Sequence, residues 1–105
     1  MNHIRIWKGT KRFALGNDLS NYVYVEFEGE VLGSCWEEYD ARGVETTFFR
    51  DSKNRIVVHC VKWSRWENEA VYGEVHVFPS LEDAAVEFQW ELERAGLIPD
   101  EVEDQ

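Results

Sequence analysis

Cysteine and long apolar runs are scarce in this chain, and each scarcity excludes a class of protein. The 105 residues include two cysteines, Cys35 and Cys60, which is too few for the disulfide framework of a small secreted domain. No apolar run approaches the roughly 18 residues of a membrane span, and the N-terminal residues form no apolar signal segment. The sequence also contains no repeat, low-complexity block or linker. We therefore expect a cytoplasmic protein.

Basic side chains are scarce as well, and they are unevenly placed. The formal net charge is −10, from 21 Asp and Glu residues against 11 Lys and Arg residues. Residues 1–20 carry four basic side chains and one acidic one, whereas residues 79–105 carry one basic and nine acidic side chains. Such a surface repels nucleic acid and anionic membranes and attracts basic proteins. We expect neither a nucleic-acid nor a membrane partner, although net charge also serves solubility alone.

Apolar and aromatic residues are abundant, and their spacing predicts an antiparallel sheet. Hydrophobic residues make up 44% of the chain, with five Trp, four Tyr and six Phe, which is enough for one core. Turn residues separate five runs with the β-branched and aromatic content of strands, at residues 22–28, 31–39, 44–50, 55–65 and 70–78. Residues 3–7 form a possible sixth strand. We predict an α+β fold with a five- to six-stranded antiparallel meander, or a half-open barrel as its variant.

One C-terminal helix is the other predicted element. Ser80 is a good N-cap, and Gly96 suits the position just after the last helical turn. Apolar side chains fall on one stripe of this helix, namely Leu81, Ala85, Phe88, Leu92 and Ala95. The stripe predicts that the helix packs on one face of the sheet. Residues 1–98 are expected to form one domain, and residues 99–105 an acidic tail.

The lengths of the turns predict which strand residues face each other. Turns with even numbers of residues pair Glu28 with Val31, Tyr39 with Val44, Arg50 with Arg55, and Arg65 with Ala70. In this register an apolar face that includes Trp36, Val58 and Val75 lies under the helix. The opposite face mixes aromatic and polar side chains. Cys35 and Cys60 fall on different faces, which disfavours a disulfide between them.

The mixed face holds the candidate ligand-binding residues. His59 and His76 would lie directly opposite each other, with their β-carbons ~5 Å apart. The other members of this candidate site are Tyr22, Tyr24, Glu37, Trp63 and Tyr72. Histidine titrates near neutral pH, so the group suits a small ligand or acid–base chemistry. No metal site or cofactor is expected, because no third ligand has a diagnostic spacing. The alternative is a half-exposed pair of histidines with a structural role.

A second candidate surface lies on the predicted helix, opposite its apolar stripe. Val86 and Trp90 are four residues apart and share a helix face, with Glu87 and Glu93 close by. Trp is common at the anchors of protein interfaces, so this group is a candidate contact patch. Packing of Trp90 against the N-terminal segment of the same chain explains the pattern equally well.

Three functions are compatible with these features. The leading hypothesis is a small acidic, non-catalytic binding protein that engages a basic protein partner, as an inhibitor or immunity-type protein would. The first alternative is a small-molecule-binding or enzymatic domain that uses the face around His59 and His76. The second alternative is a homodimer in which a second copy covers the aromatic face.

Overall fold

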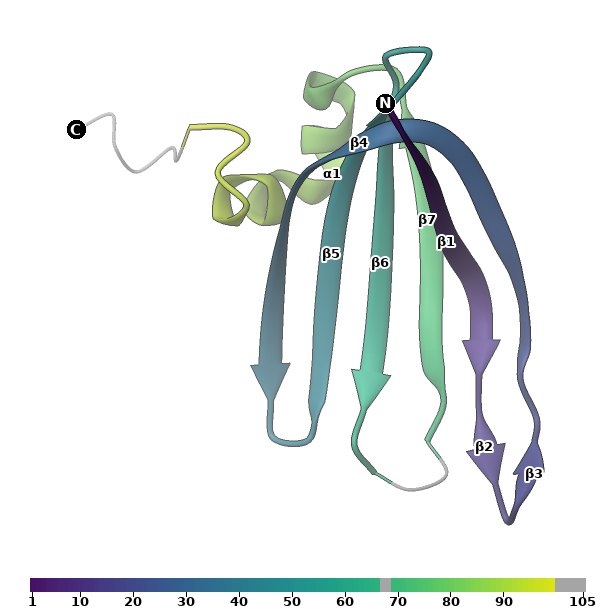
Figure 1. Ribbon diagram of the computed structural model, residues 1–105. Helices are drawn as coiled ribbons and strands as arrows, with labels where there is room; N and C mark the ends of the chain where they lie inside the picture. Colours follow the sequence, from purple (N-terminus) through teal and green to yellow (C-terminus); the bar gives the residue numbers. More distant parts are fainter. Residues whose placement is uncertain (67–68, 100–105) are drawn as a thin grey trace.

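The computed structural model describes residues 1–66 and 69–99, and it has the predicted order of strands followed by one helix (Figure 1). The elements are β1 (Asn2–Lys11), β2 (Phe13–Ala14), β3 (Asn17–Asp18), β4 (Asn21–Tyr39), β5 (Arg42–Asp51), β6 (Ile56–Ser64), β7 (Val71–Phe78) and α1 (Leu81–Arg94). The predicted α+β fold, a five-stranded antiparallel sheet with a C-terminal helix on one face, is confirmed. Apart from Pro99, the predicted acidic tail lies outside the described residues.

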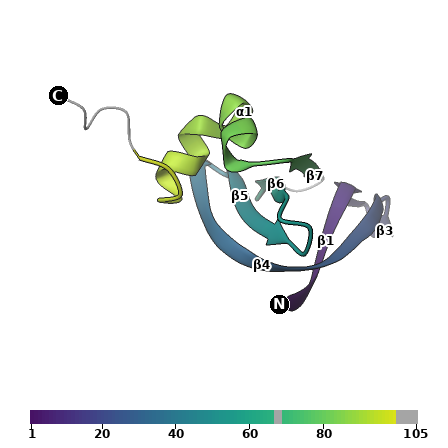
Figure 2. The same cartoon turned by 90° about the horizontal axis from the view of Figure 1, so that it is seen from above.

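The sheet closes on itself in the order β1-β4-β5-β6-β7. β1 pairs with β4 along most of its length and with β7 near its end, where Gly9 lies opposite Gly73. The N-terminal strand therefore closes the sheet and does more than extend an edge. A β-carbon at Gly73 would lie 2.7 Å from ring carbons of Trp7, so glycine makes this closure possible. α1 packs outside the closed sheet, against β5, β6, β7 and the second half of β4, while the first half of β4 curves away from the helix toward β1 (Figure 2).

β4 is one continuous strand of 19 residues, and the predicted turn at Gly29 and Glu30 is wrong. Its first half pairs with β1 and its second half with β5, and the two halves meet at Gly29. The register shifts between Val31 and Gly33, which marks a bulge. A β-carbon at Gly29 would lie 2.4 Å from the carbonyl oxygen of Arg50. Glycine here permits a bend in a strand, a role that the sequence does not distinguish from a turn.

The loop between β5 and β6 is one residue shorter than predicted. Arg50 pairs with Ile56 rather than with Arg55. The Asp51 carboxylate accepts a hydrogen bond from the Arg55 backbone N–H at 2.8 Å, and the Asp51 N–H donates to the Arg55 carbonyl at 3.0 Å. Three residues remain in the loop, and the last, Asn54, has a φ of 65°, as a three-residue hairpin loop requires. The odd loop length shifts β6 by one residue against β5.

The other two turns also depart from the predicted pairing. The observed pairs are Tyr39 with Arg42, and Lys62 with Tyr72. The first pair differs from the prediction by two residues, which leaves the faces of β4 and β5 unchanged relative to each other. The second differs by one residue, so β6 is also displaced against β7. The segment that joins β6 to β7 includes residues 67 and 68, which are not described.

Because of this register, the sheet has a core on each face. Under α1 the buried residues are Phe48, Ile56, Val58, Ala84, Phe88 and Leu92. Inside the closed sheet they are Ile6, Phe49 and Val57, with Val75 packed against them. Val58 lies under the helix as predicted, but the prediction for Val75 is wrong. The second core requires the closed sheet, which the pattern of a single strand does not reveal.

α1 begins and ends as the sequence predicts. The Ser80 side chain accepts a hydrogen bond from the Asp83 backbone N–H at 3.2 Å. After the last turn Gly96 has a φ of 76°, and the Leu97 N–H donates to the Leu92 carbonyl at 3.0 Å. Within residues 1–66 and 69–99, no helix is long and apolar enough to cross a membrane.

Candidate functional site

The two histidines of the predicted ligand site do not face each other. His76 lies opposite Val58, and His59 lies opposite Val75. The two imidazoles therefore occupy opposite faces of the sheet, and the predicted cross-strand pair is wrong. The prediction failed because β6 is displaced by one residue against β7 relative to the predicted pairing.

His59 joins an aromatic cluster that links β6 to β1. Its Nε2–H donates to the Trp7 carbonyl at 2.8 Å, because a carbonyl can only accept, and its ring meets the Trp7 ring edge to face. Burial lowers the pKa of His59, so the neutral ring is favoured. Tyr22 contacts both Trp7 and Tyr24 edge to face. These contacts give His59 and Tyr22 a structural role, and Trp7 is the member that the sequence analysis did not single out.

Trp63 and Tyr72 lie elsewhere, at a hollow of ≈500 Å³ beside Tyr39 and Arg42. A β-carbon at Gly43 would lie 2.2 Å from the Trp63 ring, so this glycine leaves the space that the indole fills. The seven predicted ligand residues are thus divided among the aromatic cluster around His59, this hollow, and a groove beside α1 that holds Glu37 and His76. A ligand-binding role for each stays a prediction.

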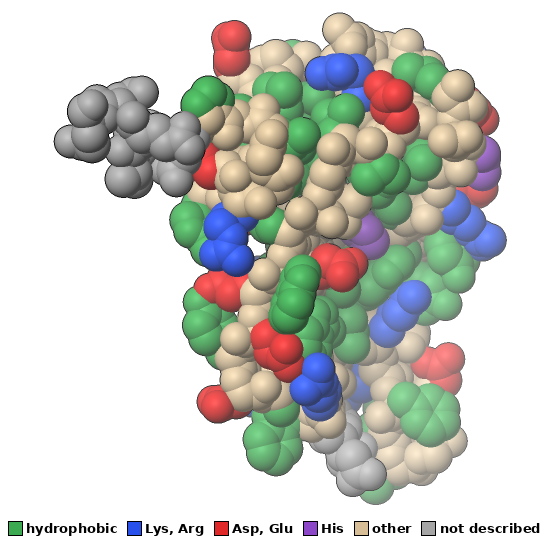
Figure 3. Space-filling model, turned by 60° about the vertical axis from the view of Figure 1, so that its left-hand side comes forward, with side chains coloured by type: hydrophobic (Ala, Val, Ile, Leu, Met, Phe, Trp, Pro, Cys, Tyr) green, Lys and Arg blue, Asp and Glu red, His purple; other side chains and the backbone are tan. Residues whose placement is uncertain are grey.

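A groove of ≈330 Å³ between α1 and the sheet combines parts of both predicted sites. Glu37 and His76 come from the predicted ligand set, and Glu87 and Trp90 from the predicted contact patch. The complete lining is Cys35, Trp36, Glu37, Val44, Thr46, Cys60, Lys62, Glu74, His76, Glu87, Phe88, Trp90 and Glu91. Figure 3 shows carboxylates, hydrophobic side chains and a histidine gathered on the side of the molecule that carries β4.

The walls of the groove carry an excess of negative charge. Glu74 accepts hydrogen bonds from Lys62 at 2.9 Å and from His76 at 3.2 Å. The bond from Lys62 is the main reason that the pKa of Glu74 falls below its ordinary value. In the described part of the chain, Glu37 and Glu91 form no ion pair. These two carboxylates are available to a cationic ligand.

The floor of the groove contains two thiols that are poor nucleophiles. Cys35 and Cys60 are both buried and free, and both flank Thr46 across neighbouring strands. They share one face of the sheet, so their predicted placement on opposite faces is wrong. Burial raises the pKa of both thiols, which keeps them protonated near neutral pH. No group of three potential metal ligands occurs among the described residues.

Two indoles stand at the rim of the groove. Trp36 is 58% exposed and Trp90 is 45% exposed. The guanidinium of Arg94 lies 4.8 Å from the centroid of the Trp90 ring, so this ring already accepts a planar cation on its face. Trp90 and Glu87 of the predicted patch line the groove, whereas Val86 and Glu93 do not.

What the groove can do chemically follows from these side chains. Glu37 and Glu91, which pair with no cation in the described ranges, and the exposed indole faces can attract and orient a cation. The buried thiols offer no activated nucleophile. Comparison with known proteins adds no family: no protein-family model, no curated protein and no solved structure matches the chain.

Proposed function

We propose that the protein is a non-catalytic binding protein that engages a basic protein partner through the groove between α1 and the sheet. The observation that carries this proposal is the presence of Glu37 and Glu91, which form no ion pair among the described residues, beside the exposed rings of Trp36 and Trp90. A Lys or Arg side chain satisfies both features at once, because its charge pairs with a carboxylate while its stem or guanidinium packs on an indole.

The charge of the whole chain favours the same partner. A net charge of −10 accelerates encounter with a basic protein and disfavours nucleic acid. A role as an inhibitor or immunity-type protein, which occupies the basic surface of a nucleic-acid-binding enzyme, suits this surface. Both cysteines are free thiols, the state that a reducing compartment maintains, and this supports a cytoplasmic location.

A small-molecule or enzymatic site centred on both histidines is not proposed. That hypothesis required His59 and His76 on one surface, and they lie on opposite faces of β6 and β7.

Calorimetric titration with a peptide of alternating arginine and glycine tests the proposal. The double variant Glu37→Gln/Glu91→Gln should bind this peptide at least about tenfold more weakly, since two charge-assisted contacts are lost. The control Glu30→Gln/Asp40→Asn removes the same charge away from the groove, and Asn suits the positive φ of Asp40.

The control variant should keep the wild-type affinity within about twofold, because distant surface charges are largely screened at physiological salt. Equal losses of affinity in the two double variants would show that net charge alone attracts the peptide. Binding of a glutamate–glycine peptide with the same affinity would also refute the proposal.

A further inference from the structure

The hairpin of β2 and β3 ends in an apolar side chain that the fold itself does not need. Leu15 and Gly16 form its two-residue turn, with φ angles of 53° and 78°. Turns with positive φ at both positions favour Asn or Gly, because a β-carbon crowds the backbone there. Leu15 is nevertheless 92% exposed at the tip. Leucine at this position is unfavourable both for the backbone and for contact with water, so a role outside the isolated chain would explain it.

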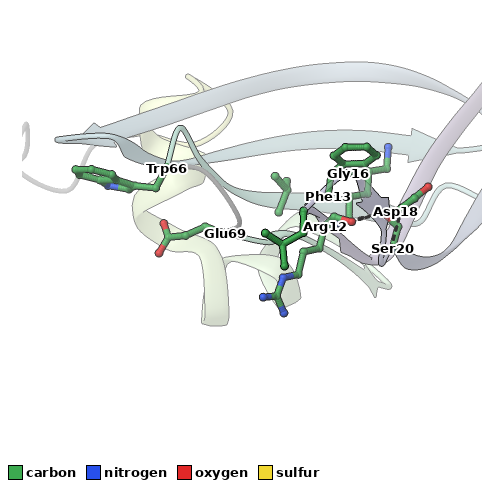
Figure 4. A pocket seen from close by; sticks show the side chains of 10 residues that line it. Arg12, Phe13, Gly16, Asp18, Ser20, Trp66 and Glu69 are labelled. Atoms are coloured by element: carbon green, nitrogen blue, oxygen red, sulfur yellow. Dashed lines mark hydrogen bonds between the residues drawn. The ribbon is translucent and has the colours of Figure 1, made fainter.

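A hollow with both apolar and polar lining adjoins this tip on the same end of the molecule. It has a volume of ≈760 Å³, and its apolar lining consists of Phe13, Leu15, Trp66 and Val71. Phe13 is 65% exposed, and Trp66 stands across the hollow from the hairpin (Figure 4). A protruding apolar side chain and a recess that is partly lined by apolar side chains thus lie side by side.

We propose that this end of the molecule is a two-fold contact between two copies of the chain, in which Leu15 of each copy enters the hollow of the other. A two-fold interface requires one surface that is complementary to itself, and a knob beside a recess has this property. The occupant of the hollow is therefore a second copy.

The charges at this end favour the same arrangement. Lys11, Arg12, Asp18 and Glu69 also line the hollow, so its rim carries both signs of charge, and Glu69 is bound to Arg42 of its own chain at 2.7 Å. Two-fold pairing can place Lys11 of one copy against Asp18 of the other. The acidic α1 lies at the opposite end of the strands (Figure 1). Ten strand residues span ~33 Å, several times the Debye length of ~8–10 Å, so the helices of two copies would repel each other little.

This arrangement does not use any residue that lines the helix–sheet groove. It does not depend on what the groove binds, because the hairpin and the groove share no lining residue. The interface also differs from the one that the sequence predicts, which was the aromatic face of the sheet.

Analytical ultracentrifugation over a hundredfold range of concentration tests the proposal. The wild-type chain should shift from monomer to dimer, and Leu15→Asn should raise the dimer dissociation constant at least about a hundredfold, since both copies lose an apolar anchor. Asn also suits the left-handed turn, so the variant should fold at least as stably as the wild type. Leu15→Gly is a second variant with the same advantage.

Val86→Ser is the matched control, because Val86 is 89% exposed but lies on α1. It should leave the dissociation constant unchanged. A wild-type chain that is monomeric throughout would overturn the proposal, as would a dimer that Val86→Ser weakens and Leu15→Asn does not. Leu15-dependent binding of the monomer to anionic lipid vesicles would also overturn it, by assigning the tip to a membrane.

Discussion

Replacement of Leu92 by alanine tests how α1 is held to the sheet. Leu92 is fully buried, and it belongs to the core that Phe48, Ile56 and Val58 form under the helix. The helix also covers the groove, because Phe88, one turn before Leu92, lines it. Loss of the Leu92 side chain should therefore loosen the helix and the groove together.

The expected loss of stability follows from the atoms removed. Leu→Ala deletes three carbons, each worth about 0.8 kcal/mol of transfer free energy, and the cavity left behind adds to this. We expect the free energy of unfolding to fall by about 3–5 kcal/mol. For a domain of this size, each kcal/mol shifts the Tm by about 4–8 °C, so the Tm should fall by at least about 12 °C.

The control on the same helix is Val86→Ala. Val86 is among the most exposed apolar side chains, and alanine has the higher helix propensity, so stability should rise by up to about 0.5 kcal/mol. Both variants are compared with the wild type by urea unfolding followed by circular dichroism. Equal effects of the two substitutions would refute the packing of α1 by the face that carries Leu92.

Three further predictions concern the sheet. Burial lowers the pKa of His59, so the folded state binds a proton there less readily than the unfolded chain. The free energy of unfolding should therefore fall as the pH drops below the ordinary histidine pKa of 6.5, and it should fall less steeply in His59→Gln. Urea unfolding at several pH values measures both slopes. Cys35 and Cys60 are buried thiols with raised pKa values, so a thiol reagent should label them only after denaturant is added, and rapid labelling of the native protein would contradict their placement. Gly43→Ala should lower stability by about 1–3 kcal/mol, because the new methyl group would overlap the Trp63 ring; thermal unfolding at or above the wild-type Tm would show that the indole is not packed there.

The sequence was sufficient to predict the helix and the number of main strands. Ser80 and Gly96 are specific capping residues, and the apolar stripe has a single helical interpretation. The alternation of apolar and polar residues located the strand segments, although two of the predicted segments, residues 22–28 and 31–39, belong to the single strand β4. These signals come from residues that are close together in the sequence, so they do not depend on which strands pair.

The pairing between strands was less predictable, because it depends on single hydrogen bonds at the turns. The Asp51 carboxylate binds the Arg55 N–H and fixes an odd loop, whereas composition alone allows an even one equally well. Gly29 lies at a bend within β4, although glycine is as typical of a turn. A one-residue error in the predicted pairing of β6 with β7 placed His59 opposite His76, whereas the structure places them on opposite faces of the sheet.

The groove could be predicted only in parts. Glu37, His76, Glu87 and Trp90 were each candidates, but on two different surfaces. Their meeting depends on which sheet face α1 covers, and that face exchanges with every one-residue shift in register. Trp36, which was assigned to the core, is instead exposed at the rim of the groove.

The groove between α1 and the sheet is proposed to bind a cationic side chain. An NMR titration of the ¹⁵N-labelled protein with the arginine–glycine peptide tests this binding residue by residue. The indole N–H signals of Trp36 and Trp90 and the amide signals of Glu87 and Glu91 should shift together and saturate, while those of the β2–β3 hairpin stay fixed. Shifts confined to other surfaces, such as the aromatic face around Tyr24, would contradict the claim.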